Sequence, residues 1–338
     1  MGRPRPSARA AAASPTHRWP SWTARAGRGF TGTLNGGDVE VWDLGPVAPG
    51  DRVVAEVDRV AGVGFDPAVA LFDADYDLFA TNDDINLQLG NLNARVDDYV
   101  REASDHFYLA VSISFFSSAG GAYQADARII RGGAPPAPHA QKLMLWFAGG
   151  SNINIRNVGT FDIDPFDAAD IDPAYAGNTD LIKTAIIDTI RQNYARFNVE
   201  IITSDDSALP AEGSDYSTLY FGQYSSTVFG ISEQVDSWNH DACDDGIIYT
   251  DGFDDPFSMR PSATQIATAI GNVAAHEAGH LLGLSHVADV LDLMDTTGAA
   301  NTLLADQEFK RAPLDHSIFR IGFQNGTKLL YDTVGAAP

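Results

Sequence analysis

The sequence has little cysteine and no long apolar run, and each shortage excludes a class of structure. Among 338 residues there is a single cysteine, Cys243, so no disulfide can form within the chain. Stability therefore has to come from packing or from bound metal. A stretch of about 18 consecutive apolar residues is also missing, which argues against a membrane-spanning helix.

Basic residues are scarce as well. Lysine and arginine together number 22 against 45 acidic residues, which gives a net charge of −23 and a pI near 4.4. Such a surface repels the phosphate backbone and excludes nucleic acid as a partner. The acidic residues are open to two interpretations. They form a solvated surface that keeps an exported protein soluble, or some of them bind Ca²⁺, although no segment has the EF-hand spacing.

Length and composition predict two globular domains. Residues 1–28 are rich in Arg and Ala but lack the apolar core of a secretory signal, so we expect a disordered tail or the remnant of a leader. Residues 29–131 alternate short apolar runs with turn clusters, which predicts an all-β sandwich. Residues 132–141 contain Gly-Gly and several prolines, typical of a semi-rigid linker.

Residues 142–338 predict an α/β (α+β) domain. Apolar runs at 143–147 and 199–203 read as strands on either side of a long amphipathic helix. A second long helix begins after Pro261, where Ser262 and Gln265 have the spacing of a capping box. That second helix contains the residues with recognisable chemistry.

The string HEAGHLLGLSH begins at His276. His276 and His280 are four residues apart, so they share one helix face and can reach one metal ion, with Glu277 beside them. Gly283 can adopt a positive φ, end the helix and turn the chain back toward His286. Three histidine ligands would leave a fourth position open, as in a catalytic zinc site.

This string, followed by Leu-Met-Asp at 293–295, resembles the metzincin zinc metallopeptidases. The resemblance implies that His276, His280 and His286 bind zinc and that Met294 forms an apolar floor beneath the metal. It also implies that Glu277 activates a zinc-bound water for peptide-bond hydrolysis. The spacing to Met294 is matrixin-like, but Val287 after the third histidine leaves the subfamily open.

The resemblance also implies an edge strand that pairs with extended substrate, and residues 226–231 are the candidates. A plain edge strand without that role is the alternative. Cys243 lies inside the expected catalytic domain and lacks the sequence of a matrixin cysteine switch, so we exclude that role.

The first domain resembles the bacterial pre-peptidase C-terminal domain, on the segments Asp66 to Asp73, Asp83-Asp84 and Phe107 to Val111. Some members of that family bind calcium, which makes two acidic sets candidates, with turn formation as the alternative. These sets are Asp83, Asp84, Asp97 and Asp98 in the first domain, and Asp162, Asp164, Asp167, Asp170 and Asp172 in the second.

The function predicted from the sequence is that of a secreted zinc endopeptidase acting on protein or peptide substrates, with Zn²⁺ as cofactor and Ca²⁺ as a second candidate. The extracellular location follows from the family resemblance. Two alternatives stay open: a binding or adhesion module with an inactive metzincin domain, and a zinc hydrolase of a non-peptide amide. The sequence determines neither the substrate nor the oligomeric state.

Overall fold

The structure, a computed structural model, describes residues 28–206, 210 and 215–338. It consists of two compact units that divide between Pro135 and Pro136. The predicted tail, residues 1–28, lies outside the described residues except for Arg28, which begins the first strand. Among the described residues, no helix is long and apolar enough to cross a membrane.

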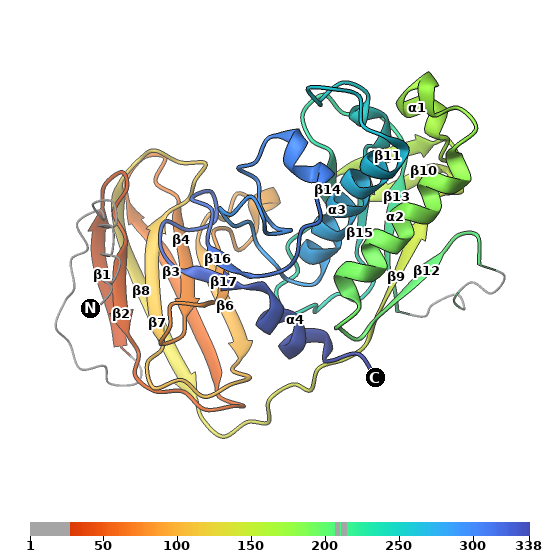
Figure 1. The fold of residues 1–338 in the computed structure, drawn as a ribbon. Coiled ribbons are helices and arrows are strands. Elements are labelled where there is room, and N and C mark those ends of the chain that lie inside the picture. Colours follow the sequence, from red (N-terminus) through yellow and green to blue (C-terminus); the bar gives the residue numbers. More distant parts are fainter. Residues whose placement is uncertain (1–27, 207–209, 211–214) are drawn as a thin grey trace, which may run out of the picture. The chain divides into compact units, whose positions relative to one another are not determined.

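Unit 1 contains, within its described residues, two antiparallel sheets of four strands each, in the orders β1-β8-β3-β6 and β2-β7-β4-β5 (Figure 1). Apolar side chains from both sheets form one common core. The strands are β1 (Arg28–Leu34), β2 (Glu40–Asp43), β3 (Arg52–Ala61), β4 (Pro67–Phe72), β5 (Leu78–Asn82), β6 (Ala94–Tyr99), β7 (Tyr108–Ile113) and β8 (Gly121–Ile130), with a 3₁₀ turn η1 (Leu87–Leu89) between β5 and β6.

The alternating sequence of β8 places apolar side chains in the core and polar side chains in solvent. Tyr123, Ala125 and Ala127 are buried, and the residues between them are exposed. Successive side chains of a strand point to opposite faces, so this pattern turns one face of the sheet toward the core. β4 differs because all of its residues are buried, in keeping with its continuous apolar sequence.

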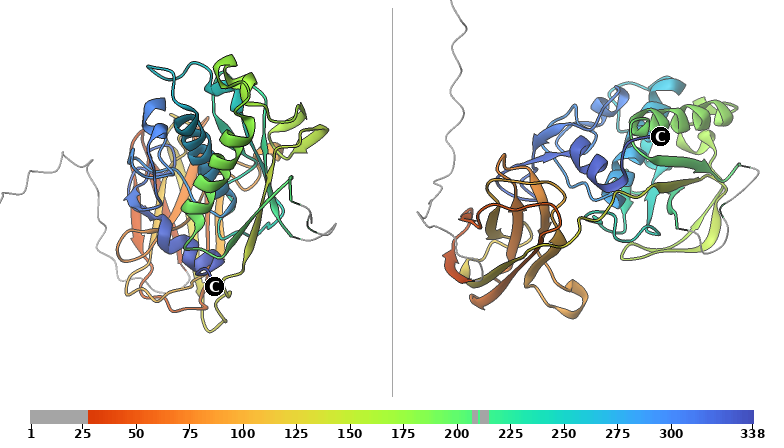
Figure 2. Two further views of the ribbon diagram at one scale, coloured as in Figure 1. Left: turned by 45° about the vertical axis from the view of Figure 1, so that its right-hand side comes forward. Right: turned by 90° about the horizontal axis from the view of Figure 1, so that it is seen from below.

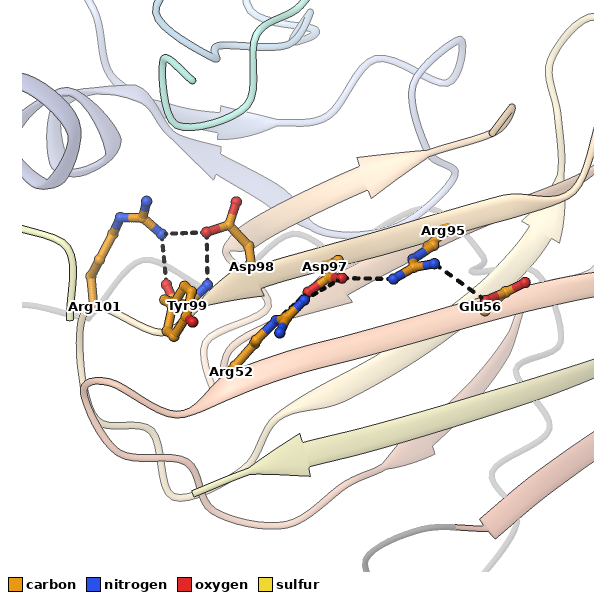
Figure 3. A network of polar contacts seen from close by, with 7 residues as sticks. All are labelled: Arg52, Glu56, Arg95, Asp97, Asp98, Tyr99 and Arg101. Carbon is orange, nitrogen blue, oxygen red and sulfur yellow. Dashed lines mark hydrogen bonds and ion pairs between the residues drawn. The ribbon is translucent and has the colours of Figure 1, made fainter. Parts of the chain in front are cut away.

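A chain of charged side chains links β3 to its neighbour β6 (Figure 3). Arg52 donates from Nε and Nη2 to the two carboxylate oxygens of Asp97, at 2.6 and 2.8 Å. Arg95 donates to the same carboxylate at 2.7 Å and approaches Glu56 at 3.9 Å. The bond with Arg52 is the main cause of the lowered pKa of Asp97. Asp97 is therefore fully engaged in holding two strands together.

Asp66 gives unit 1 a pH-dependent weakness. Its side chain is buried, and its Oδ1 has no hydrogen-bond partner among the described residues. Burial, followed by the charges of Asp84 and Asp83, raises its pKa to about 6. The folded state therefore binds this proton more tightly than the unfolded chain, and stability is lost as pH rises from about 4 through about 6.

We expect Asp66→Asn to remove this loss. The variant should be more stable than wild type at pH 7, by at most about 2 kcal/mol, and should have no advantage at pH 4. Urea unfolding at both pH values measures the difference. Asp105→Asn removes one charge from an exposed position and serves as the control. Parallel pH profiles for wild type and Asp66→Asn would contradict the expectation.

Unit 2 is built on a mixed sheet whose described strands have the order β12-β9-β13-β15-β14. β12, β9, β13 and β15 are parallel to one another, and β14 pairs antiparallel with β15 at one edge. The long helices α2 and α3 pack against each other, and α3 also packs on β13, β14 and β15 (Figure 1 and Figure 2). The edge strand β14 is therefore a neighbour of α3, the helix that contains His276 and His280.

The bounds in unit 2 differ from the predicted ones by a few residues. β9 begins at Gln141, the last residue of the predicted linker, and the predicted strand 199–203 is confirmed. The sheet strands are β9 (Gln141–Trp146), β12 (Val199–Thr203), β13 (Ser217–Phe221), β14 (Gly230–Ser232) and β15 (Asp245–Ile248). Two hairpins are formed by β10 (Gly150–Ile155) with β11 (Gly159–Ile163) and by β16 (Arg311–Pro313) with β17 (Phe323–Asn325). The helices are α1 (Ala168–Ile171), α2 (Thr179–Tyr194), α3 (Ala263–Leu281) and α4 (Gly326–Val334), with 3₁₀ turns η2 (Pro173–Tyr175), η3 (Thr250–Phe253) and η4 (Ala300–Leu304).

Candidate metal centre

Helix α3 places two histidines and a glutamate in the interior of unit 2. The predicted capping box is confirmed, because the Ser262 side chain accepts from the Gln265 backbone and the Gln265 side chain accepts from the Ser262 backbone. His276 and His280 follow near the end of the helix, one turn apart, and their ring centroids are 4.7 Å apart. Helix pitch thus brings two imidazoles together, as the sequence predicts.

The helix ends in a turn that only glycine fits. The backbone N–H of Leu284 donates to Gly279 and that of Gly283 to His280, the hydrogen-bond pattern of a Schellman motif. Gly283 has a φ of 94°, as expected for this motif. A Cβ at this position would lie 2.7 Å from the backbone nitrogen of Trp238. The absence of a side chain therefore lets the chain reverse directly behind the second histidine.

The turn brings His286 back to the other two histidines. Potential ligand atoms of His276, His280 and His286 lie within 4.8 Å of one another, a group that stands alone among the described His, Cys, Asp and Glu residues. The Nε2 atoms of His280 and His286 are 3.0 Å apart. Two nitrogens bound to one tetrahedral zinc at about 2.0–2.1 Å would be about 3.3 Å apart. The spacing is thus close to that of a metal site.

Backbone carbonyls fix the tautomers of the two helical histidines. Nδ1 of His276 lies 2.7 Å from the carbonyl oxygen of Leu293, and Nδ1 of His280 lies 2.7 Å from that of Leu284. A carbonyl only accepts, so each Nδ1 carries the proton and each Nε2 keeps a lone pair. Burial lowers the pKa of all three histidines, which makes them neutral near pH 7. This donor set fits a borderline-soft cation such as Zn²⁺.

Glu277 is buried beside the histidines and is restrained by the edge strand. Ser232 on β14 donates from Oγ to Glu277 Oε2 at 2.7 Å and also contacts the Glu277 carbonyl oxygen at 2.9 Å. A Cβ on Gly230 would lie 2.7 Å from Oε1, so the missing side chain of Gly230 makes room for the carboxylate. Burial raises the pKa of Glu277. A buried carboxylate with a raised pKa is suited to accept and return a proton.

Met294 is fully buried, and a Cβ on Gly279 would lie 2.6 Å from its sulfur. Its turn is tied by the carboxylate of Asp292, which accepts from the backbone N–H groups of Met294 at 2.8 Å and Lys310 at 2.9 Å. The preceding residue, Leu293, supplies the carbonyl that orients His276. The methionine turn, residues 292–295, therefore packs against α3, and its Leu293 carbonyl fixes the orientation of His276.

The predicted peptide-binding segment, residues 226–231, only partly coincides with a strand. β14 spans Gly230–Ser232 and is the last strand in its sheet. Cys243 is exposed and is not part of the histidine group. The structure therefore places the strand next to Glu277 and keeps the cysteine out of the metal centre.

Neither acidic set predicted for calcium forms a group of three converging ligands among the described residues. In the first set, Asp97 is held by two arginines and Asp98 pairs with Arg101 (Figure 3). In the second set, Asp172 pairs with Arg260. Arginine partners neutralise these carboxylates, so the calcium prediction gains no geometric support.

Three carboxylates of the second set instead line a separate pocket with a volume of about 390 Å³. Asp164, Asp167 and Asp170 share it with Asp251, which the sequence did not single out. Asp251 lies in the 3₁₀ turn η3, which follows β15. Burial raises its pKa, and the charges of Asp170 and Asp164 add to the effect.

Sequence reasoning missed the residues that support the site. Ser232, Asp292 and Gln324 touch Glu277, the turn at Met294 or the segment before His286. Gly230 lies within the predicted segment 226–231, but its contact with Glu277 was not predicted. Ser232 and Gln324 are distant in sequence from the groups they contact, so no local pattern marks them. Asp292 sits two residues before Met294, and an Asp that caps a turn two residues later is a recognisable signal.

Comparisons with known proteins give weak structural likenesses. No family model matches the chain, and no curated protein matches its sequence. Archaemetzincin from Archaeoglobus fulgidus is 13% identical, and the match covers 49% of this chain and 93% of that chain with a TM-score of 0.27. Archaemetzincin from Methanopyrus kandleri is 10% identical over 50% and 87%, with a TM-score of 0.28. The pre-peptidase C-terminal domain of collagenase from Bacillus anthracis is 18% identical over 30% and 90%, with a TM-score of 0.23. At these scores the likenesses assign no activity.

Proposed function

We propose that this chain is a zinc-dependent endopeptidase in which His276, His280 and His286 bind the metal and Glu277 is the general base. The observation that carries the proposal is the convergence of three imidazoles, one buried and two half-buried, of which two have their Nδ1 protons bonded to backbone carbonyls. Three neutral nitrogen ligands leave one position of a tetrahedral ion for water or substrate, which is typical of catalytic zinc.

The protein's own part in the reaction is proton transfer. Zinc, when bound, would supply the Lewis acidity that makes a water nucleophilic near pH 7 and polarises the scissile carbonyl. Glu277 accepts the proton of the attacking water and passes it to the leaving amine. Ser232 holds Oε2 of this carboxylate, so Oε1 is the oxygen assigned to the proton. Burial, the main cause of the raised Glu277 pKa, favours the protonated intermediate form.

A peptide is the proposed substrate because an edge strand adjoins Glu277. β14 pairs with β15 on one side and ends the sheet on the other. An extended peptide can add to such an edge through main-chain hydrogen bonds, and Ser232 would bring it beside the carboxylate. Export from the cell is proposed only on the family resemblance of the sequence.

Removal of the metal tests the proposal directly. We expect 1,10-phenanthroline to lower the hydrolysis of fluorescent casein at least a hundredfold, and one equivalent of Zn²⁺ to restore it after the chelator is removed. The isomer 1,7-phenanthroline, which cannot chelate, is the matched control and should leave the rate unchanged. Hydrolysis that survives complete loss of bound zinc would refute the proposal.

The two alternatives predict other outcomes of the same assay. A zinc-loaded wild type that cleaves no peptide but hydrolyses a small amide would indicate a non-peptide hydrolase. A zinc-loaded protein inactive on both substrate classes would favour a binding module. The buried, hydrogen-bonded Glu277 favours catalysis, since a binding role gives no reason to keep a carboxylate in this position.

A further inference from the structure

His286 differs from the other two histidines in how it is held. His276 and His280 lie on α3, whose main-chain hydrogen bonds fix their positions. His286 lies beyond the end of the helix, in a segment without regular secondary structure. A ligand in such a segment is positioned only by what pairs with its neighbours, so the partners of residues 284–288 decide where His286 points.

Most partners of this segment are backbone groups. Val287 donates to the Met294 carbonyl at 3.0 Å, and Asp315 donates to the His286 carbonyl at 3.0 Å. Ala288 donates to the Pro313 carbonyl at 2.9 Å. Two of these hydrogen bonds involve residues at or just after the end of β16. The hairpin of β16 and β17 therefore packs beside the segment that contains His286.

Ser285, directly before His286, is different because both of its backbone groups are met by a single side chain. Its N–H donates to Gln324 Oε1 at 2.6 Å, and its carbonyl accepts from Gln324 Nε2 at 2.7 Å. The side-chain amide thus reproduces the paired bonds of a neighbouring strand. Ser285 and Gln324 are 3% and 1% exposed, so water cannot replace either bond.

The position of Gln324 is itself fixed. It lies on β17, opposite Ala312 of β16. Glutamine is the residue whose side chain can present both an acceptor and a donor at this reach, because ionised glutamate has no donor and methionine offers only a weakly accepting sulfur. The identity of residue 324 therefore matters for the segment that leads into His286.

We propose that Gln324 is a positioning residue that clamps Ser285 and so holds His286 in the geometry that binds the metal. This inference rests on the proposed function. Gln324 reaches the metal centre only through the backbone, and removing it should loosen one of three ligands without unfolding the domain. Loss of an outer partner of a metal ligand typically costs about 10–100-fold in affinity, and we expect the lower end here.

The test compares Gln324→Met with Gln307→Met in the full-length, zinc-loaded protein. Gln307 is also a buried glutamine, and its side-chain amide donates to a loop carbonyl, that of Val290, instead of to Ser285. Zinc release into excess chromophoric chelator is timed, and the cobalt-substituted proteins are compared by visible absorption. We expect release about tenfold faster and an altered cobalt spectrum for Gln324→Met alone.

Gln324→Asn guards against a variant that does not fold, because it keeps a side-chain amide but is one methylene shorter and cannot meet both backbone groups of Ser285 at once. It too should release zinc faster than wild type. If both Gln324 variants release zinc at the wild-type rate, or if Gln307→Met accelerates release equally, the clamp is refuted. A wild type that binds zinc but cleaves no peptide would refute the proposed function alone, while no zinc binding would refute both.

Discussion

Glu277→Gln is expected to lower kcat/KM for a peptide substrate by about 10²–10⁴-fold and to leave the amount of bound zinc unchanged. Glutamine has the size of glutamate and can still accept from Ser232 through its amide oxygen, so the packing around residue 277 should survive. It cannot accept a proton from water. Steady-state hydrolysis and metal analysis of the same sample measure the two effects.

The control for this substitution is Glu200→Gln, which makes the same chemical change at a surface ion pair on β12. It should retain wild-type activity, since exposed pairs contribute little. Zinc lost in proportion to activity in Glu277→Gln would indicate that Glu277 supports the metal. More than about a tenth of the wild-type rate would rule out Glu277 as the base.

Gly283→Ala is expected to have the largest effect on the structure of the site. Its φ of 94° strains any other residue, at a cost of about 1–3 kcal/mol. The added Cβ would also lie 2.7 Å from the Trp238 nitrogen and 2.9 Å from the Asp236 carbonyl oxygen. Because both are backbone atoms, the turn has to move, and His286 moves with it. We expect lower thermal stability together with loss of most of the bound zinc.

Gly177→Ala separates the effect of backbone strain from the effect of the steric clash. Gly177 has a φ of 80°, and a Cβ there would meet nothing within 4 Å. This control should lose stability through backbone strain alone and keep its zinc. If Gly283→Ala loses no more zinc than Gly177→Ala, the turn does not govern the third ligand.

Local patterns in the sequence were enough to predict the backbone geometry at the centre of the candidate site. The spacing of His276 and His280 follows from helix pitch, and the positive φ of Gly283 follows from its place after the helix; both predictions are confirmed. The residues that hold Glu277 and Ser285 in place could not be predicted, because they come from remote parts of the chain. Ser232 is 45 positions from Glu277, and Gln324 is 39 positions from Ser285.

The sheets show the same limit. The predicted strand 199–203 is confirmed. Its run of β-branched residues is a local signal that the sequence alone provides. β1 and β6 give weak strand signals, because two glycines interrupt β1 and two adjacent aspartates interrupt β6. Both aspartates, Asp97 and Asp98, belonged to one of the calcium predictions. Arg52, the partner of Asp97, lies 45 positions away, so only the pairing of β3 with β6 reveals this contact.

The long separation between Ser285 and Gln324 also has a consequence for biosynthesis. When the ribosome has made the chain as far as Met294, every residue of the histidine string has been translated, yet the hairpin that clamps the third ligand does not exist. Gln324 lies 39 positions beyond Ser285, just before helix α4. A nascent chain that ends at Met294 therefore contains the whole motif without the proposed Gln324 contact, and we expect it to hold zinc more weakly until the β16–β17 hairpin has been made.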